Sequence, residues 1–114
     1  MSDCLFCKII ANEIPAEIVA ETDNILAFHD IDPKAPTHIL VIPKKHIATL
    51  NDIALEDLPI IGELTHTAAQ IAKQQGFDED GYRVVMNCNE DGGQTVYHIH
   101  MHVLAGRPLQ WPPG

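Results

Sequence analysis

A chain of 114 residues with 46% apolar side chains is long enough for one folded domain and too apolar for a disordered segment. Its formal net charge of −9 disfavours binding to nucleic acid or to anionic membrane surfaces. The sequence contains no apolar run of transmembrane length, and its beginning lacks the pattern of a signal peptide. We therefore expect one cytoplasmic domain over residues 1–114.

The first half of the chain predicts one short helix followed by three strands. The helix must stop before Pro15, because the residue ahead of a proline disfavours helical geometry. Three runs rich in β-branched and aromatic residues follow, and Pro43 ends the third. The predicted elements are a helix at 4–11 and strands at 17–21, 25–29 and 37–42.

The second half predicts one long helix and two more strands. Asn51 or Asp52 is expected to cap the helix, Pro59 fits only in its first turn, and Gly76 ends it. Strands are predicted at 82–88 and 96–104, followed by an irregular tail at 106–114. Because helices do not alternate with every strand, we expect an α+β domain, with one long and one short helix on one face of a five-stranded antiparallel sheet.

Three histidines, at positions 98, 100 and 102, alternate with apolar residues in the run His98–Val103. On a strand the three imidazoles would share one face and the apolar side chains the other. Burying unpaired histidines is costly, which favours a functional role over a structural one. Two roles are open at this point. A His-x-His pair can bind zinc, or one imidazole can act as a nucleophile while its neighbours donate hydrogen bonds.

The residues just before this run favour the nucleophile. In the segment Gly92–Thr95, two glycines allow backbone N–H groups to approach an anion, and Thr95 adds a hydroxyl group. Alone, the segment would be an ordinary hairpin turn. Directly before three histidines, it predicts a phosphate site.

The run His98–Leu104 matches the His-φ-His-φ-His-φ-φ signature of the histidine triad (HIT) family. The chain resembles the nucleotide-binding (Hint) branch of that family, whose members are homodimeric purine nucleoside phosphoramidases. The resemblance covers nearly the whole chain, including residues 28–31, 35–46, 87, 92–95 and 111–114.

The resemblance implies a mechanism and a set of site residues. His100 would attack the α-phosphorus and form a nucleotidyl-histidine intermediate, with His38, His98 and His102 supporting it and no cofactor required. The sheet would continue across a homodimer, whose C-terminal tails approach the neighbouring site. The implied nucleotide-binding residues are Phe6, Ile9, Phe28 and Ile31 for the purine, Asp30 for the ribose, Asn87, Gly93, Gln94, Thr95, His100 and His102 around the phosphate, and Trp111.

Cys4 and Cys7 form a CxxC pair, which supplies half of a tetrahedral zinc site. Bacterial HIT proteins that resemble this chain complete such a site with the residues that correspond to His46 and His98. The Hint branch often lacks both cysteines, so two interpretations remain: a structural zinc on these four residues, or two inert or oxidisable thiols. Cys88 is expected to be a small buried side chain.

Two other functions compete with a phosphoramidase. A second HIT branch hydrolyses dinucleoside polyphosphates with the same nucleophile. The chain could also be a nucleotide-binding or zinc-binding interaction module with vestigial catalysis, but a binding protein has no need of an attacking imidazole. We therefore expect a hydrolase that cleaves the P–N bond of purine nucleoside 5′-phosphoramidates.

Overall fold

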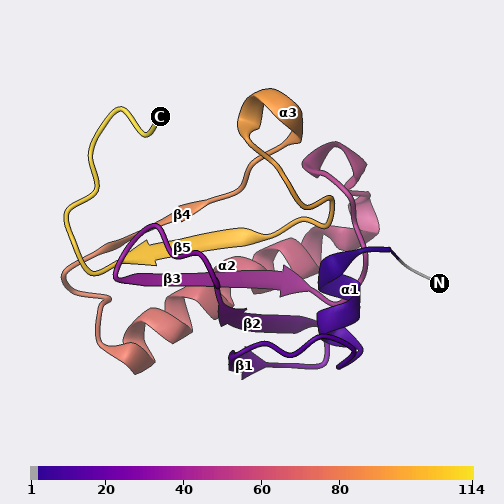
Figure 1. Cartoon of the computed structure of the whole chain (residues 1–114), viewed down its shortest axis with the longest axis horizontal. Coiled ribbons are helices and arrows are strands. Elements are labelled where there is room, and N and C mark those ends of the chain that lie inside the picture. Colours follow the sequence, from indigo (N-terminus) through magenta and orange to yellow (C-terminus); the bar gives the residue numbers. More distant parts are fainter. Residues whose placement is uncertain (1–2) are drawn as a thin grey trace.

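The structure, a computed structural model, describes residues 3–114 and is built around a five-stranded antiparallel sheet (Figure 1). The predicted α+β class is confirmed, and the first two residues of the predicted domain lie outside the described range. The strands, in the spatial order β1-β2-β3-β5-β4, are β1 Ile18–Glu21, β2 Ile25–His29, β3 Thr37–Pro43, β5 Met101–Ala105 and β4 Tyr82–Val85. The helices are α1 Leu5–Ile10, α2 Leu58–Gln75 and α3 Asn89–Gly92, with two 3-10 turns, η1 Leu50–Asp52 and η2 Leu55–Asp57.

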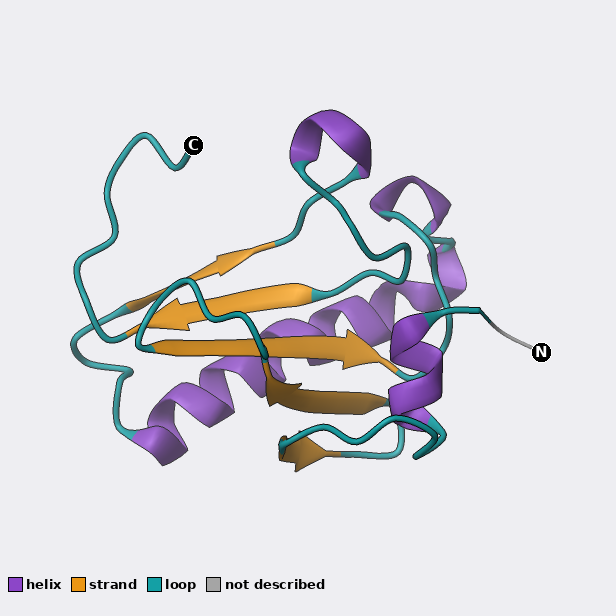
Figure 2. Cartoon of the chain, in the orientation of Figure 1, coloured by secondary structure: helices purple, strands orange, loops and turns teal. Residues whose placement is uncertain are grey.

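Helices cover both faces of the central strands, which corrects the prediction of helices on one face. Figure 2 shows α2 running behind the sheet, and α1 packs on the opposite side. Alternate residues of β2 point in opposite directions, so Ile25 meets α2 and Leu26 meets α1. β2 and β3 are therefore apolar almost without a break, as expected for strands that are buried on both sides.

The long helix begins later than predicted. Residues 51 and 52, the two alternatives for its cap, instead belong to η1, where the side chain of Thr49 accepts a hydrogen bond from the amide of residue 51. α2 starts at Leu58, and Pro59 lies in its first turn, where a missing N–H costs little. Its end is as predicted, because Gly76 adopts the left-handed conformation with φ of 80°.

The last two strands are shorter than predicted, at 82–85 and 101–105 instead of 82–88 and 96–104. The pairing of β3 with β5 ends at Val41 and Met101. Two residues further along β3, Pro43 has no N–H for the ladder, and its carbonyl oxygen accepts a hydrogen bond from the ring of His98 at 2.7 Å. His98 and His100 therefore lie in an irregular segment just before β5.

The predicted division of this segment into two faces is confirmed even though only part of it is a strand. Ile99, Met101 and Val103 belong to the core under α2. The rings of His98 and His100 lie on the other side of the sheet, where both contact Phe6 of α1. The short helix α1 and the histidines therefore share one face.

Candidate active site

A cavity of about 690 Å³ opens on the face of the sheet that carries α1. Its size is that of a typical small-molecule site. His38 lines it, as do all but two of the residues predicted to bind the nucleotide: Phe6, Ile9, Phe28, Asp30, Ile31, Asn87, Gly93, Thr95, His100 and His102.

Gln94 and Trp111 are the two exceptions. Gln94 is buried, and its side chain accepts a hydrogen bond from the amide of Asn89 and donates to the carbonyl oxygens of Ala48 and Val96. It therefore fastens the start of α3 to its surroundings. Trp111 is 80% exposed, and Pro113 lines the cavity in its place.

Part of the cavity wall was not predicted from the sequence. Leu40 lies opposite His102 in the β3–β5 register, and Leu104 lies two residues after His102, so all three share a face. That period-two signal was available in the sequence. The other missed wall residues carry no local signal and include Leu5, Ile14, Pro15, Ala16, Val85 and Pro113.

His100 has the protonation pattern of a nucleophile. Its Nδ1–H donates to the carbonyl oxygen of His98 at 2.8 Å, which leaves Nε2 on the other edge of the ring unprotonated. Burial lowers the pKa of His100, and the hydrogen bond to His98 only partly opposes that effect. The ring is therefore neutral at pH 7 and borders the cavity.

His102 lies beside His100. The ring centroids of His100 and His102 are 4.9 Å apart, and Nδ1 of His102 lies 2.9 Å from Nε2 of His38. Burial is the main cause that lowers the pKa of His102, to about 4, and it also lowers the pKa of His38. A carboxylate oxygen of Asp30 is 3.4 Å from Nε2 of His38, so it can share that ring's proton.

We expect the free energy of unfolding to fall as the pH is lowered from about 7 to about 5. Burial holds the pKa of His102 at about 4, against 6.5 when the ring is in water, so the unfolded chain binds more protons in that interval. One proton changes the free energy by at most about 1.4 kcal/mol per pH unit, and by less for a partly exposed ring. Urea unfolding of the native protein and of His102→Gln measures this. An identical slope in both proteins would contradict the assignment.

The loop before the histidines does not offer all the donors that the sequence suggested. The amide of Gly93 donates to the carbonyl of Glu90 at 2.9 Å, and the amide of Gln94 donates to that of Asn89 at 3.0 Å. Both amides are thus used to close α3, with Gly93 at a φ of 85° that favours glycine. The Asn87 and Thr95 side chains border the cavity and remain as donors.

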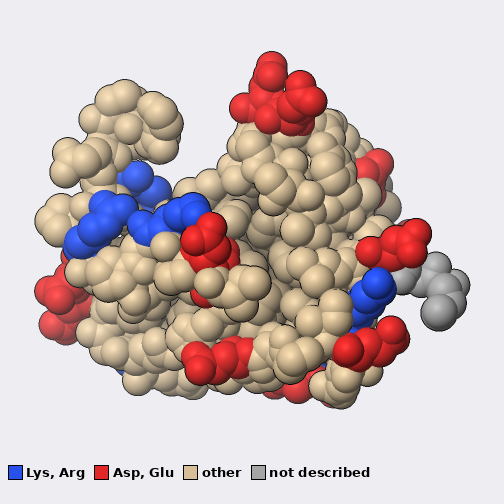
Figure 3. All heavy atoms as spheres, viewed as in Figure 1, with Lys and Arg blue, Asp and Glu red and all other residues tan. Residues whose placement is uncertain are grey.

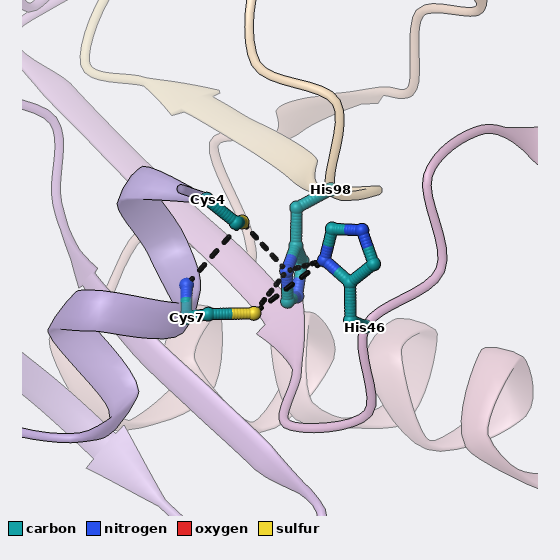
Figure 4. A group of neighbouring side chains, drawn as sticks. All are labelled: Cys4, Cys7, His46 and His98. Atoms are coloured by element: carbon teal, nitrogen blue, oxygen red, sulfur yellow. Dashed lines mark hydrogen bonds between the residues drawn. The ribbon is translucent and has the colours of Figure 1, made fainter. Parts of the chain in front are cut away.

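Four possible zinc ligands converge between α1 and the His98 segment (Figure 4). Nδ1 of His98 lies 3.3 Å from the sulfur of Cys4, 3.6 Å from that of Cys7 and 3.2 Å from Nδ1 of His46. Tetrahedral zinc at usual bond lengths requires about 3.5 Å between sulfur and nitrogen and about 3.3 Å between two nitrogens. The hydrogen bond from Nε2 of His98 to Pro43 also leaves Nδ1 unprotonated, so the set fits zinc.

A second group, Asp30, His38 and His102, is equally close together but fits a metal poorly. Nδ1 of His38 accepts a hydrogen bond from the amide of Lys34 at 3.0 Å, so the neutral ring carries its proton on Nε2. That nitrogen is the one that faces His102 and Asp30. A metal would have to displace this proton, and the group is better described as a hydrogen-bonded network.

The surface around the site carries charges of both signs (Figure 3). Acidic side chains cover α3, whose first turn contains Glu90 and Asp91, whereas basic side chains gather where the C-terminal segment leaves the sheet. Among residues 3–114, no helix has the length and apolar character of a membrane span. An anionic ligand would enter against the net charge of −9 and depend on nearby donors.

The HIT domain family model matches residues 11–109, and the chain belongs to this family. It is 54% identical over 107 residues to the purine nucleoside phosphoramidase of Escherichia coli K12, covering 94% of this chain and 90% of that protein. The crystal structure of a HIT family hydrolase from Legionella pneumophila Philadelphia 1 superposes with a TM-score of 0.96 at 55% identity, covering 98% of this chain and 100% of that one. A histidine triad protein from Clostridium difficile has a TM-score of 0.93 at 49% identity, covering 96% of both chains.

Proposed function

We propose that this chain is a hydrolase that cleaves the P–N bond of purine nucleoside 5′-phosphoramidates and releases the nucleoside monophosphate. The observation that carries the proposal is the unprotonated Nε2 of His100 at the edge of the cavity, beside His102. The similarity to the phosphoramidase of E. coli supports the substrate class. The three histidines of the family signature, together with His38, account for the chemistry.

The reaction proceeds in two displacements at phosphorus. Nε2 of His100 forms a bond to the α-phosphorus as the P–N bond breaks, and the departing amine takes up a proton from water or from a flanking histidine. Water then attacks the nucleotidyl-histidine, which restores the neutral imidazole. Hydrogen-bond donors to the non-bridging oxygens stabilise the charge in both steps, and the proposed donors are His102, Thr95 and Asn87, which line the cavity.

The cavity wall suggests how the nucleotide lies. Phe6, Ile9, Phe28 and Ile31 offer an apolar surface to the purine, and Asp30 is available for the ribose hydroxyl groups. One oxygen of Asp30 already accepts the amide of Asp32 at 2.8 Å, which fixes the carboxylate in place. The fixed carboxylate supports the ribose assignment, since an acceptor that is already oriented loses little freedom when it binds.

We also propose that Cys4, Cys7, His46 and His98 hold a structural zinc ion. Zinc bound by four protein ligands leaves no position for water, so its role is to join α1 to the segment that precedes β5. No other cofactor enters the proposed reaction. Thiolate ligands persist in a reducing compartment, which agrees with the cytoplasmic location expected from the sequence.

The proposed assembly is a homodimer in which the sheet continues from one chain to the other. β4 is an edge strand of the sheet, and Val84 on it is 42% exposed. Arg83 of the same strand donates from Nη2 to the carbonyl of Gln110 at 2.9 Å, so the tail that carries the exposed Trp111 lies against this edge. A second chain could contact both the exposed edge of β4 and the tail. Nucleic acids and anionic membranes, in contrast, are disfavoured as partners by the net charge.

The direct test is to trap the intermediate. We expect an AMP–lysine conjugate, mixed with the protein and quenched in alkaline denaturant within the first turnover, to leave one adenylyl group on the peptide that contains His100. Diadenosine triphosphate should label more slowly. Among the described lining residues Lys34 is the only Lys or Arg, and its ammonium is 2.6 Å from the Asp32 carboxylate. Little positive charge is therefore left to balance a polyphosphate leaving group. An adduct elsewhere, or none in either reaction, would contradict the proposal.

A further inference from the structure

A chain of hydrogen bonds begins at a main-chain group outside the histidine triad. The amide N–H of Lys34 donates to Nδ1 of His38 at 3.0 Å. Nε2 of His38 lies 2.9 Å from Nδ1 of His102. His102 borders the cavity beside His100. These hydrogen bonds therefore connect the loop between β2 and β3 with the centre of the site.

The hydrogen bond from the Lys34 amide sets the direction of the hydrogen bonds that follow it. A backbone amide can only donate, so Nδ1 of His38 must accept, and the neutral ring carries its single proton on Nε2. That proton is shared between Nδ1 of His102 and the Asp30 carboxylate, which is 3.4 Å away. Nδ1 of His102 is then an acceptor, and the proton of the neutral His102 ring lies on its Nε2.

We propose that the main-chain amide of Lys34 is a positioning group that fixes His38 and His102 as Nε2–H tautomers, and so makes His102 a donor to the substrate phosphate. The inference rests on the proposed function for its final step alone. If His38 carried its proton on Nδ1 instead, its Nε2 would be an acceptor facing Nδ1 of His102. His102 would then donate to His38 and present an unprotonated nitrogen to an anion.

The loop holds the amide in place from several sides. The carbonyl oxygen of Lys34 accepts a hydrogen bond from Nη2 of Arg107 at 3.0 Å. Asp30, at the start of the loop, accepts the amide of Asp32, and prolines occupy positions 33 and 36. Since His38 is only 5% exposed, water has little access to compete for its Nδ1. The positions of loop and ring are thus set before substrate arrives.

Nuclear magnetic resonance can read the tautomers without substrate. Long-range proton–nitrogen correlation spectra near pH 7 should show protons on Nε2 of His38 and His102, and on Nδ1 of His100. A proton on Nδ1 of His38 would overturn the inference. Because this measurement needs no reaction, its failure is distinct from the absence of an adduct on His100, which would instead overturn the proposed function.

Two variants of Lys34 test the effect on catalysis. Lys34→Pro removes the amide proton, whereas Lys34→Ala removes the same side chain and keeps that proton, so the ratio of their kcat values isolates the amide. We expect kcat of Lys34→Pro to be about tenfold lower or more than that of Lys34→Ala, with little difference in KM. The reason is that His102 would no longer be held as a donor to the charge that develops on the phosphate during the reaction. Equal kcat values would overturn the positioning role.

A second pair covers the case in which Lys34→Pro fails to fold. Glutamine places an amide N–H near the position of Nε2 of histidine, and asparagine places it near Nδ1. We therefore expect His38→Gln to retain several-fold more kcat than His38→Asn, since only glutamine can donate to Nδ1 of His102. Equal losses in the two variants would overturn the inference.

Discussion

Replacing His100 by alanine is expected to lower kcat/KM for a purine nucleoside phosphoramidate by about 10³-fold or more, because no other group can form the covalent intermediate. His100 is the ring whose Nδ1 is held by the carbonyl of His98, so its Nε2 alone has the lone pair at the required place. Single-turnover rates with an AMP–amine conjugate measure the loss.

Binding and a matched histidine control separate chemistry from folding. The apolar wall and Asp30 are unchanged in His100→Ala, so the affinity for AMP should stay within about tenfold of the native value. His66→Ala removes an exposed histidine of α2 that does not line the cavity, and it should leave turnover unaltered. Substantial turnover in His100→Ala, or an equal loss in His66→Ala, would contradict the assignment of the nucleophile.

Replacing Cys7 by serine is expected to abolish stoichiometric zinc and to lower the melting temperature by about 10 °C or more. The sulfur of Cys7 lies 3.4 Å from Nδ1 of His46 and 3.6 Å from Nδ1 of His98, so the substitution removes one of four convergent ligands. Elemental analysis of the purified protein gives the metal content, and thermal unfolding with and without a chelator gives its contribution to stability.

Cys88→Ser is the control for this experiment. It makes the same atomic change in a half-buried cysteine outside the convergent ligand set. It should retain one zinc per chain and the native response to chelator. If neither the native protein nor Cys88→Ser contains zinc, or if Cys7→Ser retains it, the four residues are not a metal site.

Loss of the proposed zinc should also disturb the proposed active site, because His98 belongs to both groups of residues. Its ring points at the cysteines, while its carbonyl oxygen holds Nδ1 of His100. Phe6, one residue before Cys7, packs edge-on against the ring of His100 with centroids 5.1 Å apart. A displaced α1 would therefore disturb both the apolar wall and the orientation of the His100 ring.

Local signals predicted most of the fold. Runs of β-branched and aromatic residues located β1, β2 and β3, with Pro43 at the end of the third, and Gly76 marked the end of α2. The errors came from long-range constraints. Where β5 begins depends on Pro43, some 58 positions earlier in the chain (101 minus 43), and the covered second face of the sheet depends on where α1 packs. Neither is visible within a short window of sequence.

The candidate site was predictable to the extent that side-chain identity defines it. The three alternating histidines marked the segment, and the resemblance added the residues of the cavity wall. The partners that orient the rings escaped prediction, because they are main-chain groups of His98, Pro43 and Lys34. A carbonyl or amide has the same identity at every position, so sequence gives no sign of which one will face an imidazole.

This reliance on main-chain partners bears on protein design. A designer who grafted His98, His100 and His102 onto another sheet would transfer the rings without the groups that choose their tautomers. The smallest transplantable unit includes the loop around Lys34 and the end of β3 at Pro43 as well. Conversely, we expect substitutions of nearby side chains to be tolerated as long as these two backbone segments keep their positions.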